Sequence, residues 1–295
     1  MKQFSEVHLG VFYALGAYLI WGISPLYFKH LDVLPVFEII SHRVVWSVLF
    51  LAIILTITRQ WERFVKLLQS PKLMALLCLS TALISTNWLV FIWSINNDHM
   101  LDASLGYFIN PLVNVLLGLI FLNESLSRVK WVAIVLACIG VLVQVIELGS
   151  LPWISLVLPF SFAFYGLVRK KIKVEALVGL FIETLLGLPV ALIYLCYFAN
   201  SATSNLLNNP FSLNIWIVSA GVVTALPLIF FAQAALRLKL STLGFFQYLA
   251  PSLMFLFAVG FYNEPIGIAK SITFIFIWAG ILLFVFENQI HRLAK

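Results

Sequence analysis

The chain has 295 residues, of which 62% are hydrophobic and only 10% are charged, and its formal net charge is +6. Soluble globular proteins are nearer half apolar and a quarter charged, so this composition excludes a soluble enzyme, a disordered chain and a secreted disulfide scaffold. The basic residues lie in gaps between apolar runs, which argues against nucleic acid as a partner. We therefore expect a protein whose solvent is largely lipid.

Ten apolar segments follow one another along the chain. A helix needs about 20 residues to bridge about 30 Å of hydrocarbon. The segments that meet this length are centred near residues 19, 46, 84, 112, 137, 160, 186, 224, 251 and 277. The first segment has no Ala-x-Ala-like exit, so we interpret it as a retained span and not as a signal peptide. The sequence predicts an all-α integral membrane protein with ten transmembrane helices.

Two of the connections differ from the short turns between the other segments. Residues 58–72 are amphipathic, with basic residues on one helical face and an apolar face formed by Trp61, Phe64, Leu67 and Leu68. Such a pattern is typical of a helix lying in the membrane interface, and the alternative is a solvated linker. Residues 199–214 are uncharged and rich in turn-forming residues, which predicts an outer loop without regular structure.

The orientation of the helices follows from the lysines and arginines. With a cytoplasmic N-terminus, the predicted inner segments hold fifteen of the 18 basic residues, including the run at 169–173. The predicted outer segments hold two, and Arg43 lies inside a span. This asymmetry matches the positive-inside rule. We expect a multi-pass protein of the cell (inner) membrane with both termini in the cytoplasm.

The chain contains an internal repeat. A shift of 140 residues places Pro111 on Pro251, Asn123-Glu124 on Asn263-Glu264 and Lys130 on Lys270 without a gap. The sequence therefore predicts two five-helix repeats, at residues 1–147 and 148–295. Because five is an odd number, the second repeat would enter the membrane from the opposite side. Inverted repeats of this kind recur in secondary transporters, where one half rocks against the other.

The repeated Asn-Glu pairs have a structural and a functional interpretation. Each pair follows a long apolar helix and precedes another, so Glu124 and Glu264 are placed to neutralise a helix N-terminus. The other interpretation is a role in transport, as for other charges near lipid. We favour the structural role.

Six segments carry a resemblance to a known family. They are AYLIWGISPLYFKHL (17–31), EIISHRVVWS (38–47), TNWLVFIWSIN (86–96), ASLGYFINPL (103–112), FYGLVRKKI (164–172) and LGFFQYLAP (243–251). In these segments the chain resembles the RarD-like branch of the EamA family, within the drug/metabolite transporter superfamily. The resemblance implies ten helices in two inverted EamA repeats, an inner-membrane location and movement of small organic solutes. RarD-like proteins are linked by name to chloramphenicol sensitivity.

Few charged residues lie inside the predicted spans, and these are candidates for coupling. On the second span, Glu38 and His42 share a helical face, whereas Arg43 is turned away by about 100°. Glu183 lies on the seventh span. We expect both glutamates about eight residues into their helices, roughly 12 Å deep.

These charges have alternative roles. Arg43 in a buried ion pair with one glutamate would fix helix packing without touching solute. His42 would be a hydrogen-bonded interior histidine or a proton relay. Because a neighbouring arginine holds a carboxylate in its charged form, the glutamate not paired with Arg43 is the better proton carrier. We choose Glu183, since Glu38 shares its helix with Arg43.

Aromatic and amide side chains would line a largely uncharged cavity near the midplane. The predicted lining residues are Trp21, Asn87, Trp88, Tyr107, Asn110, Tyr165, Gln247 and Tyr248. Such a lining suits an amphipathic or aromatic solute. The alternative for each aromatic residue is ordinary packing or a position in the interfacial belt.

The sequence lacks the motifs of hydrolytic, metal and nucleotide chemistry, and its three cysteines form no pairing pattern. We expect no cofactor, no metal and no catalytic residue. The expected partners are a small-molecule solute and the lipid bilayer, while protons and a second copy of the chain are left open. The sequence thus favours a secondary transporter that exports amphipathic metabolites or drugs by alternating access. The alternatives are a passive facilitator without ion coupling and, less favoured, an intramembrane enzyme or receptor.

Overall fold

The computed structural model describes residues 2–96, 99–149, 151, 153–260 and 267–287. The regular elements within these ranges are all helices. The second Asn-Glu pair, at residues 263 and 264, and the terminal basic residues Arg292 and Lys295 lie outside the described residues.

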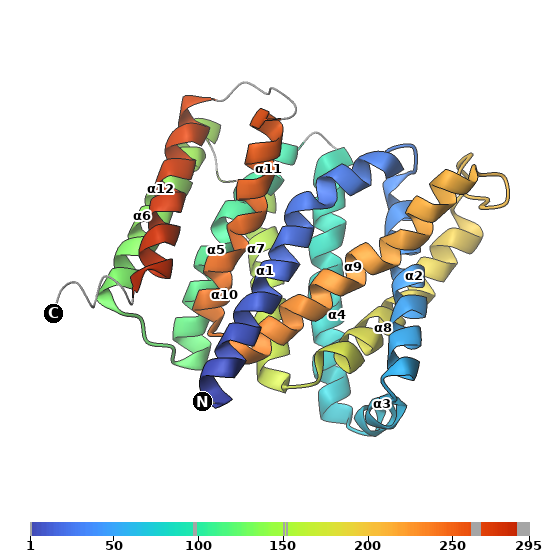
Figure 1. Cartoon of the computed structure of the whole chain (residues 1–295). Helices are drawn as coiled ribbons and strands as arrows, with labels where there is room; N and C mark the ends of the chain where they lie inside the picture. The colour runs from blue at the N-terminus through green and yellow to red at the C-terminus, as the bar shows by residue number, and fades with distance from the viewer. Residues whose placement is uncertain (1, 97–98, 150, 152, 261–266, 288–295) are drawn as a thin grey trace. The chain divides into compact units, whose positions relative to one another are not determined.

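The helices follow the predicted apolar segments closely (Figure 1). Their bounds are α1 (Lys2–Phe28), η1 (Lys29–Leu31), α2 (Val36–Ile57), α3 (Trp61–Leu68), α4 (Pro71–Asn96), α5 (Met100–Leu122), α6 (Arg128–Leu148), α7 (Ile154–Ile172), α8 (Ala176–Tyr197), α9 (Phe211–Arg237), α10 (Leu240–Gln247), α11 (Leu249–Gly260) and α12 (Ile268–Val285). Each of the ten predicted centres lies within one of these helices. The all-helical class is confirmed.

Eight helices among the described residues are long and apolar enough to cross a membrane, by length and composition. They are α1, α2, α4, α5, α6, α8, α9 and α12. Helix α7 carries three basic residues in its last turn, at 169–171. The segment centred near 251 is divided at Tyr248 into α10 and α11, which have 8 and 12 residues. The count of ten spans therefore stays a prediction.

The chain divides into two compact units that do not follow the order of the sequence. Unit 1 comprises residues 1–88 and 168–237, and unit 2 comprises 89–167 and 238–295. The boundaries fall inside α4 and α7. Each unit takes helices from both predicted repeats, so compactness and duplication divide the chain differently. The duplication itself stays a prediction.

Unit 1 is built on the contacts of α9 with α1 and α2, and of α2 with α8. Figure 1 shows α1 (blue) and α9 (orange) running side by side. At Gly221 of α9, an added Cβ would lie 2.4 Å from the carbonyl carbon of Trp46 on α2. The two backbones meet there, and the Ser47 hydroxyl donates to the Gly221 carbonyl at 3.1 Å. Small residues allow this close approach between apolar helices.

Unit 2 is built on two helix pairs, α6 with α12 and α5 with α10. The Thr273 hydroxyl on α12 donates to the Gly140 carbonyl of α6 at 3.0 Å and accepts from the Gln144 amide at 3.0 Å. Polar contacts of this kind join helices where water is scarce, because each group otherwise stays unpaired in hydrocarbon.

The two unusual connections both lie in unit 1. Residues 61–68 form the short amphipathic helix α3, within the predicted 58–72, and the rings of Trp61 and Phe64 pack on Phe181 of α8. Arg63 forms an ion pair with Glu175, which precedes α8. The predicted outer loop at 199–214 has no helix over 198–210, while α9 begins at Phe211, a little earlier than predicted.

Candidate functional site

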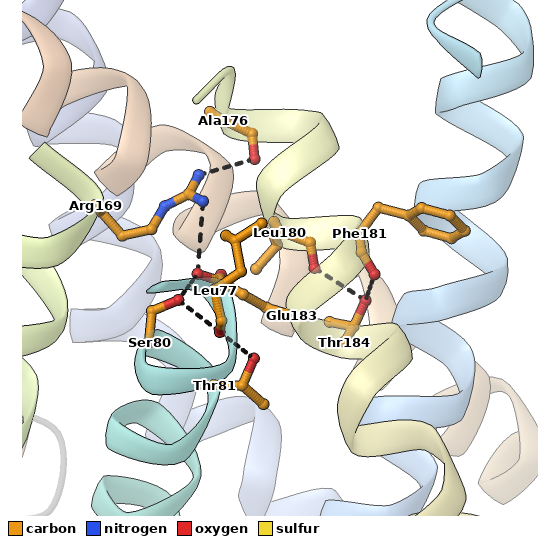
Figure 2. Close-up of polar contacts among 9 residues, drawn as sticks. All are labelled: Leu77, Ser80, Thr81, Arg169, Ala176, Leu180, Phe181, Glu183 and Thr184. Atoms are coloured by element: carbon orange, nitrogen blue, oxygen red, sulfur yellow. Dashed lines mark hydrogen bonds and ion pairs between the residues drawn. The ribbon is translucent and has the colours of Figure 1, made fainter. Parts of the chain in front are cut away.

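Unit 1 buries an ion pair between two apolar helices. Arg169 lies in the last turn of α7 and Glu183 is the eighth residue of α8, and the two residues are 1% and 3% exposed. Nη1 of Arg169 lies 3.5 Å from Oε1 of Glu183, and Nη2 donates to the Ala176 carbonyl at 3.2 Å (Figure 2). A single charge at this place would be costly, and the pair removes much of that cost.

The surroundings of the pair come from three helices. Ser80 of α4 donates to Oε1 of Glu183 at 2.5 Å, the same oxygen that faces Arg169 (Figure 2). A Cβ added at Gly179 would lie 2.0 Å from Nη1 of Arg169. A side chain at this position would therefore collide with the guanidinium. Glycine makes room for Arg169 against α8.

This geometry corrects one expectation and bears on a second. The basic run at 169–173 is not all loop, because α7 continues to Ile172 and Arg169 turns into the protein. Glu183 is the predicted proton carrier because Glu38 shares its helix with Arg43. The structure places a different arginine, Arg169, beside Glu183, so Glu183 also has a countercharge. The proton role of Glu183 stays a prediction.

Glu38 also occupies a different place from the one expected. It is the third residue of α2, in the first helical turn, and not eight residues deep. Its carboxylate is buried and accepts hydrogen bonds from the hydroxyls of Ser201 at 2.8 Å and Thr203 at 3.2 Å. These donors belong to the loop that follows α8. A helix N-terminus is a favourable position for a negative charge.

His42 and Arg43 follow on the same helix. His42 is 5% exposed, and its Nε2 has no hydrogen-bond partner among the described residues. Arg43 donates from Nε to the Thr224 hydroxyl at 2.8 Å, and its guanidinium lies over the rings of Phe28 at 5.1 Å and Trp88 at 4.9 Å. Cation–π contacts of this kind stabilise a charge inside an apolar bundle.

The remaining candidates of unit 1 lie on α1 and α4. The Trp21 ring packs against the rings of Tyr18 at 5.4 Å and Phe231 at 5.9 Å. Asn87 is 7% exposed and stands next to Trp88 in the chain. The aromatic contacts of Trp21 are compatible with the packing alternative.

In unit 2, polar residues of α5 lie against those at the end of α10. The Asn114 amide donates to the Gln247 carbonyl oxygen at 2.8 Å, and the Tyr248 hydroxyl donates to the Phe108 carbonyl at 3.2 Å. Asn110 is 2% exposed, and its Oδ1 has no hydrogen-bond partner in the described part of the chain. Of the predicted lining residues, Asn110, Gln247 and Tyr248 are buried here, and Gln247 bonds to Asn114 of α5.

Two aromatic candidates complete unit 2. The Tyr107 ring packs against Phe91 at 5.6 Å, and the Tyr165 ring packs against Phe162 at 6.0 Å. The twelve predicted site residues thus divide between the units, with seven in unit 1 and five in unit 2. A single cavity lined by all the predicted solute contacts stays a proposal.

Glu124 neutralises a helix N-terminus, as its position predicts, but the helix is distant in the sequence. Its carboxylate accepts from the backbone N–H groups of Leu240 at 2.6 Å and Ser241 at 3.0 Å, which begin α10. The helix that follows Glu124 along the chain, α6, is capped by Ser127 instead. The sequence signal identified the role of Glu124 and missed its partner.

Comparison with known proteins places the chain in a family. The model of the EamA-like transporter family matches residues 8–146. The chain is 57% identical to Protein RarD of Salmonella typhi over 282 residues, which covers 96% of each chain. The chain belongs to the RarD-like branch of the EamA family. This RarD-like protein is a multi-pass membrane protein from a family of transporters.

Two further comparisons agree with this assignment. The RarD-like chain is 53% identical to an uncharacterized transporter of Vibrio cholerae, over 93% of this chain and 91% of the other. A solved crystal structure shares the fold with a TM-score of 0.70 at 16% identity, covering 95% of this chain and 96% of the other. At that identity, the likeness concerns the fold alone.

Proposed function

We propose that this RarD-like protein is a secondary transporter that exports small amphipathic metabolites or drugs, of the type that its branch links to chloramphenicol sensitivity. The carrying observation is the buried Arg169–Glu183 pair inside a bundle of apolar helices. Charges among lipid-facing helices are costly and mark solute or ion pathways. The names of the relatives support transport as the general activity.

The proposed mechanism is alternating access between two inverted repeats, residues 1–147 and 148–295. The contacts of α5 with α10 support a solute site there, because buried amides and a tyrosine hydroxyl lie at the division between α10 and α11. Interrupted helices are common solute-contact elements in transporters. The proposed solute contacts are Trp21, Asn87, Trp88, Tyr107, Asn110, Tyr165, Gln247 and Tyr248.

A first experiment identifies the solute. Metabolites inside and outside the cells are compared with the gene deleted and overexpressed, and candidates are then tested for flux in proteoliposomes. Alanine at Asn110 or Gln247 should reduce that flux while the amount of protein in the membrane stays near normal. An equal loss of flux and abundance would assign these residues to packing.

The driving force has two candidates, which are proton coupling and a passive facilitator without ion coupling. The facilitator is supported by the contacts of the two buried carboxylates, because Glu183 has Arg169 and Ser80 beside it and Glu38 has two hydroxyl donors. Flux is measured in proteoliposomes with and without an imposed pH gradient. Solute accumulation against its own gradient, driven by the pH gradient, supports proton coupling. Solute flux that is the same with and without the pH gradient supports the facilitator.

The proposed orientation has both termini in the cytoplasm of the cell and the loop at 198–210 outside. Single cysteines in a chain freed of Cys78, Cys138 and Cys196 test it. A cysteine at Asn208 should react with an impermeant reagent from outside, and one at Lys171 only from inside. Outside labelling at Lys171 would reverse the orientation. A homodimer stays open, and cross-linking in the membrane tests for it.

A further inference from the structure

The Arg169 guanidinium has more hydrogen-bonding capacity than its neighbours use. It carries five N–H donors, and at 1% exposure it has no bulk water to satisfy them. Nε has no hydrogen-bond partner among the residues that the structure describes. A buried donor without an acceptor costs free energy. The arginine is therefore held in place without being fully satisfied.

The contact between Arg169 and Glu183 is also long. Charge-assisted N–H to carboxylate bonds are usually about 2.7–2.9 Å, whereas Nη1 and Oε1 are 3.5 Å apart. The short bond of Glu183 is made with Ser80 of α4, at 2.5 Å. Figure 2 shows the carboxylate between the two, with Ser80 on one side and the guanidinium on the other. Glu183 thus has a second polar neighbour on α4.

The main chain of α8 is shaped around the same group. Gly179 has no side chain, which leaves the space in which Nη1 of Arg169 lies. The Ala176 carbonyl accepts a hydrogen bond from Nη2 and so orients the guanidinium. A planar guanidinium that is oriented in this way presents a donor edge for two oxygens of one carboxylate. A lysine ammonium would not offer that paired geometry.

We propose that Arg169 binds the carboxylate group of a transported solute, and that Glu183 occupies this position when no solute is bound. The inference rests on the proposed transport function and names a substrate class for it, an amphipathic monocarboxylate. The solute and Glu183 compete, because both carboxylates would accept from the same N–H groups of the guanidinium. A doubly charged phosphate would bring more negative charge into the apolar bundle than a carboxylate does, which favours the carboxylate as the ligand.

Ligand binding tests the competition directly. The full-length protein in lipid nanodiscs is titrated with benzoate, benzamide and benzylamine, which share a ring and differ in charge, and calorimetry measures each Kd. Replacing Glu183 by Gln removes the internal competitor, so Glu183→Gln should bind benzoate at least tenfold tighter than the wild type. Its affinity for neutral benzamide should stay within twofold. Lys171→Gln, which removes an exposed positive charge from the same turn of α7, is the matched control and should bind like the wild type.

Variants at the arginine distinguish binding from a purely structural role. Arg169→Lys keeps the positive charge but loses the paired N–H donors of the guanidinium. Benzoate affinity should therefore fall at least tenfold, while the melting temperature changes little. The double variant Arg169→Gln/Glu183→Gln keeps the pair neutral and should fold, yet it should bind none of the benzoate. Equal benzoate affinity in the wild type, Glu183→Gln and Arg169→Lys would overturn the proposal.

The result is separable from the broader function. Suppose that proteoliposomes transport a neutral solute and that benzoate affinity is unchanged by substitutions at Arg169 and Glu183. Transport would then be supported, and the proposed carboxylate subsite would be contradicted. Benzoate binding that depends on Arg169 in a protein that moves no solute would support the subsite and contradict transport.

Discussion

The two compact units bury different kinds of polar group. Among the described residues, those that are both charged and buried are Glu38, Arg169 and Glu183, and all three belong to unit 1. The buried polar residues described in unit 2 are serines, a threonine and amides, such as Asn114 and Gln247. The same apolar type of helix therefore tolerates a charge only where opposing groups meet it.

The difference has an energetic reason. A buried amide can be satisfied by one neighbouring amide, and such a bond in a membrane is worth about 0.6 kcal/mol on average. A buried charge needs a countercharge or several hydrogen-bond donors, and loss of one partner of a buried ion pair costs roughly 3–5 kcal/mol. Unit 1 should thus be sensitive to single substitutions at its polar sites, whereas unit 2 should be tolerant.

The largest expected effect comes from breaking the Arg169–Glu183 ion pair in unit 1. Arg169→Met leaves Glu183 without its countercharge, so the free energy of unfolding should fall by about 3–5 kcal/mol. Arg169→Met/Glu183→Met should recover most of this loss, because methionines of similar volume need no countercharge. Denaturant titration in detergent micelles measures both variants. A double variant no more stable than the single one would contradict the charge explanation.

The next effect tests the space for the guanidinium. Gly179→Ala places a methyl group 2.0 Å from Nη1 of Arg169, so the stability should fall by about 1–3 kcal/mol. Gly187→Ala on the same helix is the control, because its nearest atom, a Val44 methyl carbon, lies 3.7 Å away. That variant should be neutral or slightly more stable, since alanine favours a helix. Equal losses in the two variants would show a general effect of alanine in α8.

A smaller effect tests the amide pair in unit 2. A double-mutant cycle of Asn114→Ala and Gln247→Ala should give a coupling energy of about 0.5–1 kcal/mol, as for other hydrogen bonds between membrane helices. The same denaturant titration supplies the four stabilities. A coupling energy as large as that of the charged pair in unit 1 would remove the contrast between the units.

The smallest effect concerns the cap of α10. Glu124→Gln keeps an acceptor for the N–H groups of Leu240 and Ser241 and removes the negative charge, so the loss should be about 0.3–1 kcal/mol. Glu147→Gln is the control, because Glu147 lies near the C-terminal end of α6, where the helix dipole disfavours a negative charge. It should be neutral or slightly stabilising. A loss at both positions would assign the effect to surface charge in general.

Much of the fold and part of the site could be predicted from local patterns. The predicted helix centres follow apolar run lengths, and the amphipathic helix α3 follows its own periodicity. The inward position of Asn110, Gln247 and Tyr248 is predicted as part of a cavity lining, whereas the hydrogen bond of Gln247 with Asn114 comes from the structure alone. The buried role of Arg169 was not readable, because Arg169 begins a run of four basic residues at 169–173, a pattern typical of a loop.

The sequence by itself determined that the chain is helical, apolar and suited to a membrane, because length and apolar content decide whether a segment can cross hydrocarbon. Only the tertiary structure decided which polar groups meet. Ser80 and Glu183 are 103 positions apart, and Glu124 and Leu240 are 116 positions apart. Such pairs depend on how distant helices cross and rotate, since a residue's facing partner is set by helix packing and not by its neighbours along the chain.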